Sequence, residues 1–427
     1  MKRALIIAYY WPPAGGPGVQ RWLKFVTYFK EFGITPVVYI PENPHYPLVD
    51  ESFMMDVPSV EIIKTPIKEP YRFARLLSKK RTNKISSGII TKRKQTFLEK
   101  IMLWVRGNFF IPDARIGWVK PSVAYLENYL TNNPVDVIIT TGPPHSLHLI
   151  GMQLKKTLNL PWLTDFRDPW TTIHYHKALR LSVSSKRKHK KLESQVLNNC
   201  DQVVVTSPTA KLEFEGLTNT PIEVITNGYE ISKEEIASFD ESFSIVHVGS
   251  LLSERNPNVL WKVLSRLCEE HSEIAKNLVI KLVGAVSNDI VESIREHGLG
   301  DALELIGYVP HEDAIKFQRK AQLLLLVEID TPETRAIIPG KLFEYLAARR
   351  PIVALGPEAS DIETILNETQ SGSFHSYQEE TQLYLTLQAS YNQYKNDLLL
   401  VDSKGIEKYS RKALTETMSN TIFKMLK

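Results

Sequence analysis

Short apolar runs alternate with longer amphipathic segments along the whole chain, and this alternation restricts the possible folds more than any other feature. Each apolar run has the length of a buried strand, and the segments between them have room for helices. In the first half we predict strands at Arg3–Tyr10, Thr35–Ile40, Asp136–Thr141, Pro161–Asp165, Gln202–Thr206 and Glu223–Thr226. In the second half we predict strands at Phe243–Val248, Leu278–Val283, Leu303–Leu305, Leu323–Val327 and Ile352–Ala354. Such alternation indicates an α/β fold with parallel sheets.

A polar, acidic stretch at Tyr229–Ser242 separates the two series of strands. The chain has 427 residues, which exceeds the roughly 250–300 residues that one hydrophobic core supports. We therefore predict two Rossmann-like domains, residues 1–228 and 243–405, joined by a linker at 229–242. We expect residues 406–427 to form an amphipathic helix that crosses back and packs on the N-terminal domain.

The ends of the strands indicate where a ligand binds. In open parallel sheets, ligands bind beyond the carboxyl ends of the strands. With two such sheets facing one another, we expect the binding cleft to lie between the two domains. The N-terminal domain would then form one side of the cleft and the C-terminal domain the other.

Composition excludes several classes of protein. The two cysteines, Cys200 and Cys268, are too few and too far apart for a disulfide framework or a zinc site. No apolar run approaches the ~18 residues that span a bilayer, so we expect a cytoplasmic protein. The net charge of +4 is small, and no RNA-binding motif is present, so we expect no nucleic-acid partner.

Several motifs occur in a fixed order across the two halves. They are Trp11–Gly16 (WPPAGG), Asp165–Trp170 (DFRDPW) with Glu193, Asn227-Gly228, Val248–Arg255 (VGSLLSER), Ile306–Pro310 (IGYVP) and Gly340–Ala347 (GKLFEYLA). Together they resemble glycosyltransferase family 4, the retaining enzymes of the GT-B fold, over nearly the whole chain. The resemblance implies a nucleotide-sugar donor held by the C-terminal domain and an acceptor on the N-terminal side. It also implies a role in bacterial polysaccharide or lipopolysaccharide assembly.

The chain departs from the family pattern at two places. The family often carries two glutamates eight positions apart, and Glu344 matches the second while the first falls at Ala336. An arginine common in the strand–turn motif is replaced by Ser250, and the nearby lysine position holds Arg255. These departures leave open which carboxylate lies near the reacting carbon.

Leaving-group stabilisation requires cations beside the departing diphosphate. Arg255 follows the first strand of the second domain, and Lys341 follows Pro339-Gly340 at the start of a helix. Cations and helix N-terminal amides together form an anion site, so we assign both residues to catalysis and donor binding. The alternative is that both are solvated surface cations.

The remaining donor-site assignments are Glu344, Ser250, Leu342, Gly15 and Gly16. Glu344 shares a helix face with Lys341 and would bind the ribose hydroxyls, unless it only pairs with Lys341. Gly15 and Gly16 follow the first strand and could offer backbone amides to phosphate or acceptor, or could form a plain turn. Ser250 and Leu342 are assigned from the motifs that contain them.

Two further catalytic candidates lie at strand ends in the first half. His145 follows Gly142-Pro143-Pro144 and could orient the transferred sugar, although a lone histidine is commonly structural. Asp168 is the candidate for acceptor binding or proton removal, while an Asp–Arg brace around Asp165 and Arg167 is the competing interpretation. A front-face reaction, in which the departing phosphate deprotonates the acceptor, needs no protein base.

No metal site and no cofactor are predicted. The nearest match to a metal-binding Asp-x-Asp motif is Glu328-Ile329-Asp330, one of many chance acidic pairs. Arginine and lysine can supply the charge that a metal ion would otherwise provide.

Two basic segments, Lys79–Lys100 and Lys186–Lys191, suit contact with an anionic membrane. Each cation near such a surface contributes about 1 kcal/mol, and a tryptophan-containing apolar stretch follows the first segment. We therefore expect a peripheral protein at the inner face of the cytoplasmic membrane, with a glycan or lipid-linked acceptor. An ordinary solvated charge run is the alternative.

The leading hypothesis is a retaining, metal-independent glycosyltransferase that uses a UDP- or GDP-sugar. One alternative is a sugar-nucleotide epimerase with the GT-B fold, which would turn over donor without acceptor. Another is a non-catalytic module that binds nucleotide sugar or glycan, which the missing glutamate at Ala336 would favour.

Overall fold

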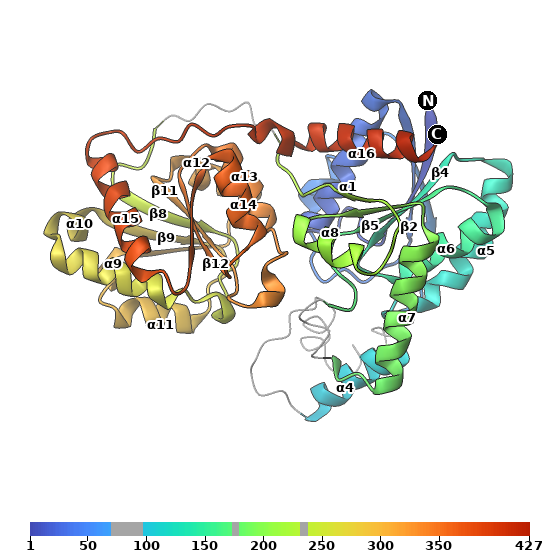
Figure 1. Ribbon diagram of the computed structural model, residues 1–427, viewed down its shortest axis with the longest axis horizontal. Coiled ribbons are helices and arrows are strands. Elements are labelled where there is room, and N and C mark those ends of the chain that lie inside the picture. Colours follow the sequence, from blue (N-terminus) through green and yellow to red (C-terminus); the bar gives the residue numbers. More distant parts are fainter. Residues whose placement is uncertain (70–96, 173–178, 231–237) are drawn as a thin grey trace. The chain divides into compact units, whose positions relative to one another are not determined.

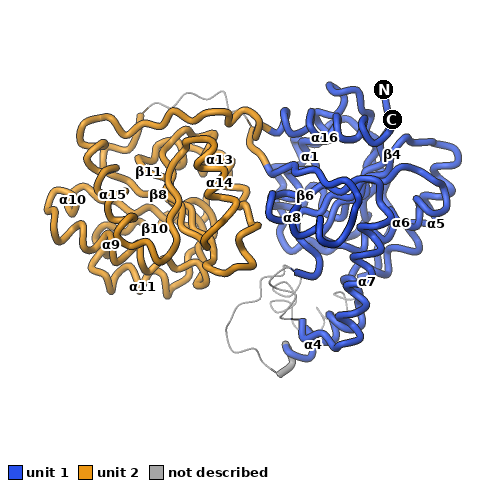
Figure 2. The backbone as a smooth tube through the Cα atoms, in the orientation of Figure 1, with its two compact units in different colours: residues 1–227, 411–427 blue, residues 228–410 orange. Residues whose placement is uncertain are grey.

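The computed structural model describes residues 1–69, 97–172, 179–230 and 238–427. The chain forms two compact units (Figure 2). Unit 1 contains Met1–Asn227 together with Arg411–Lys427, and unit 2 contains Gly228–Ser410. The predicted linker at 229–242 lies partly outside the described residues.

The sheet of unit 1 has seven parallel strands in the order β3-β2-β1-β4-β5-β6-β7. The strands are β1 (Lys2–Ile7), β2 (Ile34–Pro41), β3 (Glu61–Thr65), β4 (Val137–Gly142), β5 (Trp162–Phe166), β6 (Gln202–Val205) and β7 (Ile222–Val224). β1 and β4 are buried along almost their whole length, because helices cover both faces of a parallel sheet.

The helices of unit 1 lie in two layers. They are α1 (Pro17–Tyr28), η1 (Phe29–Phe32), η2 (Glu51–Met54), α4 (Phe97–Phe109), α5 (Ile116–Asn132), α6 (Ser146–Leu158), α7 (Val183–Asn199), α8 (Pro208–Glu215) and α16 (Arg411–Met425). One apolar core joins the sheet to α5, α6, α7 and α8, and the other joins it to α1 and α16. The C-terminal helix lies along α1 (Figure 1), which confirms the predicted return of the chain to the N-terminal domain.

The sheet of unit 2 has six parallel strands in the order β10-β9-β8-β11-β12-β13. The strands are β8 (Phe243–Val248), β9 (Leu278–Val283), β10 (Leu303–Gly307), β11 (Leu323–Val327), β12 (Ile352–Gly356) and β13 (Gly372–Ser376). β8 and β11 lie at the centre of the sheet and are buried throughout.

Helices also cover both faces of the unit 2 sheet. They are η4 (Ser253–Arg255), α9 (Asn258–Glu270), α10 (Ser272–Asn277), α11 (Asn288–Glu296), η5 (Gly300–Ala302), α12 (His311–Lys320), η6 (Pro332–Thr334), α13 (Gly340–Ala348), α14 (Asp361–Thr369), α15 (Glu380–Lys395) and η7 (Ile406–Tyr409). The cores on the two faces are formed with α9, α11 and α15 on one side and with α12, α13 and α14 on the other. The predicted parallel α/β architecture in two halves is therefore confirmed.

Sequence patterns missed β3 and β13, each of which lies at one edge of its sheet. β13 reads GSFHS and carries little apolar signal, and β3 (EIIKT) is short and partly exposed. Helix α1 ends at Tyr28, and the chain tightens into η1 before Gly33, which has φ 79°.

Candidate functional site

Two tight glycine turns follow the carboxyl ends of neighbouring strands in unit 2. Gly249 follows β8 with φ 106°, and Gly284 follows β9 with φ 122°, a region that L side chains avoid. A Cβ on Gly284 would lie 2.5 Å from the Gly249 carbonyl oxygen. The two backbones thus approach each other so closely that only glycine fits at residue 284.

The Lys341 ammonium lies directly over the first of these turns. A Cβ on Gly249 would be 2.9 Å from Lys341 Nζ. Lys341 is the second residue of α13, whose N-cap Pro339 provides no side-chain cap. Burial, and next the nearby Arg255 charge, lower the pKa of Lys341 to about 8. A half-buried cation beside a helix N-terminus forms a site suited to an anion.

Arg255 is held in place by a buried carboxylate. Its Nε and Nη2 donate to Glu328 Oε1 at 3.1 and 2.9 Å, and the Ile329 amide donates to the same oxygen. Glu328 is fully buried and follows β11, whereas the Arg255 side chain is 28% exposed. The other oxygen, Oε2, is buried without a hydrogen-bond partner in the described residues. Glu328 therefore fixes the orientation of the Arg255 side chain, part of which stays accessible to solvent.

Glu344 is partly exposed on the next turn of α13. Its Oε2 accepts from Gln318 Nε2 of α12 at 2.9 Å, and His311 Nε2 lies 3.9 Å from Oε1. No Lys341–Glu344 ion pair is found in the described part of the chain. The carboxylate is positioned by α12 instead, and Oε1 is the oxygen left for a ligand hydroxyl.

Ser250 and Leu342 occupy different environments. Ser250 is exposed beside Gly249. Leu342 is fully buried in the apolar core, and its amide donates to the Pro339 carbonyl. The predicted donor-binding role of Leu342 therefore does not extend to its side chain, because that face of α13 packs on the sheet.

The glycine loop of unit 1 is tied to the following segment. The Gly15 amide donates to the Leu48 carbonyl at 3.0 Å, and a Cβ on Gly15 would contact the Leu48 side chain. Gly16 is the N-cap of α1, with φ 105° and open space where a Cβ would be. Gly15 is thus used to hold the loop, and Gly16 is the residue that a ligand could approach.

Arg167 joins this loop to the loops that follow β4 and β5. A Cβ on Gly18 would lie 1.6 Å from Arg167 Nη1, and Arg167 Nη2 donates to the Pro143 carbonyl. Its Nε is buried without a partner in the described residues. These contacts place a guanidinium at the carboxyl edge of the unit 1 sheet, a feature that the sequence suggested only through DFRDPW.

Asp165 is a structural brace. Arg21 Nη2 and Trp22 Nε1 donate to it at 2.9 and 2.7 Å, and Thr141 Oγ1 donates at 2.9 Å. Burial would raise the pKa of Asp165, but the charge and hydrogen bond of Arg21, the Arg167 charge and the Trp22 hydrogen bond together lower it below its ordinary value. The brace that we considered for this cluster exists, with Arg21 rather than Arg167 as the partner.

His145 and Asp168 lie in the expected loops of unit 1. His145 precedes α6 and is buried, and its ring stacks on Trp170 with centroids 4.9 Å apart. Trp170 Nε1 in turn donates to His189 Nδ1 at 3.1 Å. Asp168 is half-buried. Because His145 is buried and stacks on Trp170, we interpret it mainly as a packing residue.

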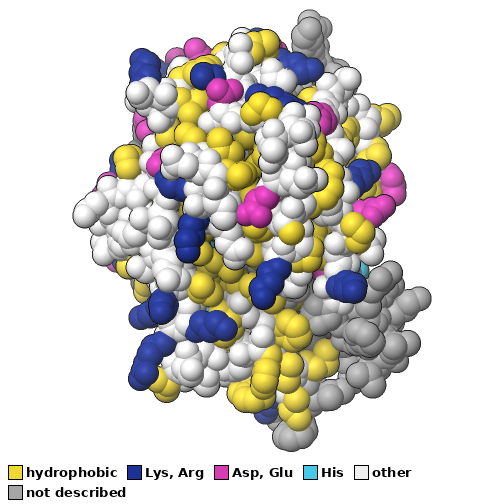
Figure 3. Space-filling view, turned by 90° about the vertical axis from the view of Figure 1, so that its right-hand side faces the viewer, with side chains coloured by type: hydrophobic (Ala, Val, Ile, Leu, Met, Phe, Trp, Pro, Cys, Tyr) yellow, Lys and Arg dark blue, Asp and Glu magenta, His cyan; other side chains and the backbone are white. Residues whose placement is uncertain are grey.

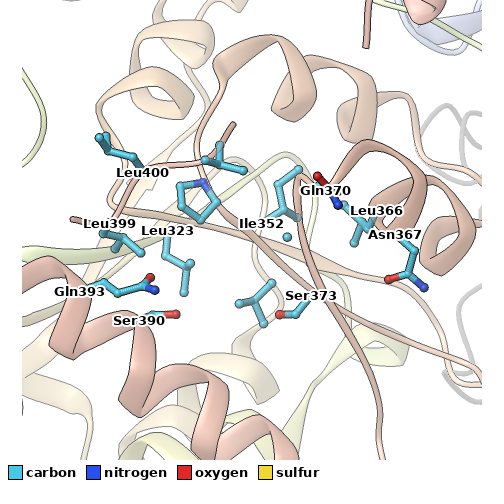
Figure 4. A pocket seen from close by; sticks show the side chains of 14 residues that line it. Leu323, Ile352, Leu366, Asn367, Gln370, Ser373, Ser390, Gln393, Leu399 and Leu400 are labelled. Carbon is cyan, nitrogen blue, oxygen red and sulfur yellow. The ribbon is translucent and has the colours of Figure 1, made fainter. Parts of the chain in front are cut away.

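Unit 2 also has a cavity of about 490 Å³, which lies away from Lys341 and Arg255. Leu323, Ile352 and Gly372, which line it, are the first residues of β11, β12 and β13 (Figure 4). The cavity is thus at the amino ends of the strands, opposite the edge that holds Lys341 and Arg255. Leu399, Gln393 and Ser390 give it a neutral lining, so we assign it no part in anion binding.

Sequence reasoning missed His247, Glu328 and Gln318. The available signal was weak: His247 is a polar residue within the apolar strand FSIVHV, and Glu328 directly follows LLLLV. Within the described residues, no group of three or more His, Cys, Asp or Glu is arranged to bind a metal ion. No helix in the same part of the chain has the length and apolarity to cross a bilayer.

Known structures share this architecture over the full chain. Sucrose-phosphate synthase from Thermosynechococcus elongatus is 13% identical with a TM-score of 0.62, covering 100% of this chain and 99% of that one. The apo form of the lipopolysaccharide outer core galactosyltransferase WaaB is 13% identical with a TM-score of 0.60, covering 99% of each. A structure described as trehalose-6-phosphate from E. coli bound with UDP-2-fluoro glucose is 12% identical with a TM-score of 0.62, covering 100% and 99%. At sequence identities of 12–13%, the similarity to these structures shows a shared fold.

Family models identify the chain itself. Residues 89–233 match Glycosyltransferase Family 4, and residues 228–372 match Glycosyl transferases group 1. A search of curated proteins found no matching sequence. The two family matches follow one another along the chain and agree with the two α/β units. The chain therefore belongs to the family 4 glycosyltransferases and is a glycosyltransferase of the GT-B fold.

Proposed function

We propose that this glycosyltransferase takes a UDP- or GDP-sugar as donor and transfers the sugar with retention of configuration, without a metal ion. The observation that carries the donor site is the pair of cations at the carboxyl edge of the unit 2 sheet. Lys341 lies over the Gly249 turn, and Arg255 is oriented by Glu328. A diphosphate bound there would meet two positive charges and the N-terminal amides of α13.

These groups match the charge that develops during the reaction. As the glycosidic bond breaks, negative charge grows on the departing diphosphate, and pre-oriented cations lower the barrier. The pKa of about 8 keeps Lys341 mostly protonated at neutral pH. Two fixed cations supply the stabilisation for which other transferases use a divalent metal, which supports the metal-independent proposal.

Glu344 would bind the donor ribose. Gln318 fixes one of its oxygens, so the carboxylate is pre-oriented, and a carboxylate accepts from vicinal hydroxyls. The structural relative described as bound with UDP-2-fluoro glucose supports a uridine diphosphate donor.

The acceptor would bind at the carboxyl edge of the unit 1 sheet. Gly16, Arg167 and Asp168 lie in the loops at that edge. We propose a glycan or lipid-linked acceptor, with Asp168 as the residue that binds it or removes its proton. If the departing phosphate takes that proton, Asp168 serves in binding alone.

We also propose peripheral contact with an anionic membrane through α4 and α7. Ile101, Trp104 and Phe109 of α4 are exposed, as is Val183 at the start of α7. α7 also carries the exposed cations Lys186, Arg187, Lys188, Lys190 and Lys191. Figure 3 shows basic and hydrophobic side chains gathered at the end of unit 1 where these helices lie. Residues 70–96, which hold most of the predicted segment Lys79–Lys100, lie outside the described residues.

Two hydrogen bonds from the Asn108 side chain join α4 to the residues at the start of α7. Asn108 Oδ1 accepts from the Ser182 amide at 2.8 Å, and Asn108 Nδ2 donates to the Arg180 carbonyl at 3.3 Å. The apolar side chains of α4 and the basic face of α7 are thus held together. Such a combination suits anionic lipid surfaces, where a lipid-linked acceptor would be found.

Nucleotide release from a panel of UDP- and GDP-sugars tests the function, with EDTA present and with or without a lipid-linked sugar acceptor. Acceptor-dependent release supports transfer, and NMR of the product's anomeric configuration tests retention. Release without acceptor would instead support the epimerase, and binding without turnover would support a non-catalytic module. Lys341→Met should abolish release, whereas Lys262→Met, at an exposed position, should not.

A further inference from the structure

His247 lies inside the unit 2 sheet, one residue before the end of β8, and is completely buried. Its Nδ1 is 3.0 Å from the Leu325 carbonyl oxygen on the neighbouring strand β11. A carbonyl oxygen only accepts hydrogen bonds, so Nδ1 must carry the proton. The strand pairing thus determines the tautomer of this histidine.

The other ring nitrogen faces the donor site. Nε2 lies 3.1 Å from Lys341 Nζ. An ammonium group only donates, so Nε2 must offer its lone pair. Burial, and next the Lys341 charge, hold the pKa of His247 well below its ordinary value. The imidazole is therefore neutral, and it accepts from Lys341 as a fixed part of the sheet.

A neutral acceptor is chemically distinct from the carboxylate that holds Arg255. Glu328 orients Arg255 but also offsets its charge. His247 orients the ammonium and leaves its full positive charge for a ligand. The charged groups that act on Lys341 are Arg255 of η4, Glu328 after β11 and Glu344 of its own helix, α13.

We propose that His247 is a positioning residue that holds the Lys341 ammonium, through Nε2, in place to receive the donor diphosphate. This inference rests on the proposed donor site. His247 contacts Lys341 and acts through it. Replacing His247 should therefore change the orientation and the protonation of Lys341 first.

Two substitutions separate the roles of the two ring nitrogens. In His247→Asn, the amide nitrogen can take the place of Nδ1 and still bond to Leu325, but the side chain is too short to reach Lys341. In His247→Gln, the amide oxygen can reach the place of Nε2 and accept from Lys341. His375→Phe is the matched control, because His375 is also buried in a strand of unit 2.

The test measures UDP and GDP binding by isothermal titration calorimetry from pH 6.5 to 9.5. Loss of a hydrogen bond to a charged group predicts about tenfold weaker binding in His247→Asn at neutral pH. Without its acceptor, the Lys341 ammonium should have a lower pKa. The pH above which binding weakens should therefore be lower in His247→Asn than in the wild type. His247→Gln should recover most of both effects, and His375→Phe should match the wild type.

A double-mutant cycle shows whether His247 acts through Lys341. Adding His247→Asn to Lys341→Met should cause no further loss of affinity. Additive losses, or an unchanged pH profile in a folded His247→Asn protein, would overturn the inference. If neither variant at 247 folds while His375→Phe does, His247 is a core residue, and the inference also fails. A wild-type protein that binds neither nucleotide would instead contradict the proposed donor site.

Discussion

Lys341 Nζ lies so close to the Gly249 backbone that a Cβ at residue 249 would be 2.9 Å from it. The first residue after β8 and the second residue of α13 are thus mutually dependent, although 92 positions separate them in the sequence (341 minus 249). Glycine at 249 serves two purposes, because it adopts φ 106° and leaves room for the ammonium.

Gly249→Ala should therefore weaken donor binding at least tenfold as well as destabilise the protein by about 1–2 kcal/mol through backbone strain. Gly298→Ala is the matched control, since Gly298 has φ 73° and open space around its Cβ position. The control should lose similar stability but keep its affinity for UDP. Calorimetric titration and thermal unfolding of both variants check this, and equal affinities would contradict the steric argument.

Lys341→Met should stabilise the protein at pH 7 while weakening donor binding. Burial, and next Arg255, lower the pKa of Lys341 from 10.5 to about 8, so keeping the lysine charged costs about 3 kcal/mol below pH 8. Methionine removes that cost but leaves His247 Nε2 without its donor, so the net gain should be about 1–3 kcal/mol.

The gain from Lys341→Met should shrink between pH 8 and 10.5. In this range Lys341 is already deprotonated in the folded wild-type protein, whereas it is still protonated in the unfolded chain. Urea unfolding at pH 7 and pH 10 measures the difference. Lys262→Met, at an exposed position, should change stability by less than about 0.5 kcal/mol at both pH values. A gain that is equal at pH 7 and pH 10 would contradict this origin.

Asp165→Ala should destabilise the protein by about 3–5 kcal/mol, because it leaves the Arg21 guanidinium buried without its carboxylate. Glu407→Ala removes an exposed ion pair with Arg349 and should cost at most about 1 kcal/mol. Because Asp165 has a lowered pKa, its contribution should be present above about pH 4 and be lost as the pH falls further. Chemical unfolding from pH 7 to pH 3 tests both statements.

Trp104→Ser combined with Phe109→Ser should reduce binding to vesicles that contain anionic lipid, since these side chains are 44% and 68% exposed on α4. Reversing the charges of Lys186, Arg187 and Lys190 should do the same and remove the dependence on salt. Leu212→Ser, at an exposed position on α8, is the control and should bind like the wild type. Cosedimentation with anionic and neutral vesicles provides the measurement.

The α/β architecture could be predicted because each central strand is a continuous apolar run. β8, β9 and β11 were predicted at their observed bounds, since burial on both faces leaves no polar interruption apart from residues such as His247. The edge strand β13 could not be predicted, because a strand with one neighbour needs less apolar sequence.

The sequence alone indicated the cations of the proposed donor site, Arg255 and Lys341, and the acidic residue Glu344, because motif and position were enough to name them. Only the tertiary structure decided how each is held: by Glu328 after β11, His247 from β8 and Gln318 from α12. These partners are 26 to 94 residues away in the chain (318 to 344 at the near end and 247 to 341 at the far end). Local patterns report backbone preference and burial, whereas contacts between side chains of different strands and helices arise only when the sheet has formed.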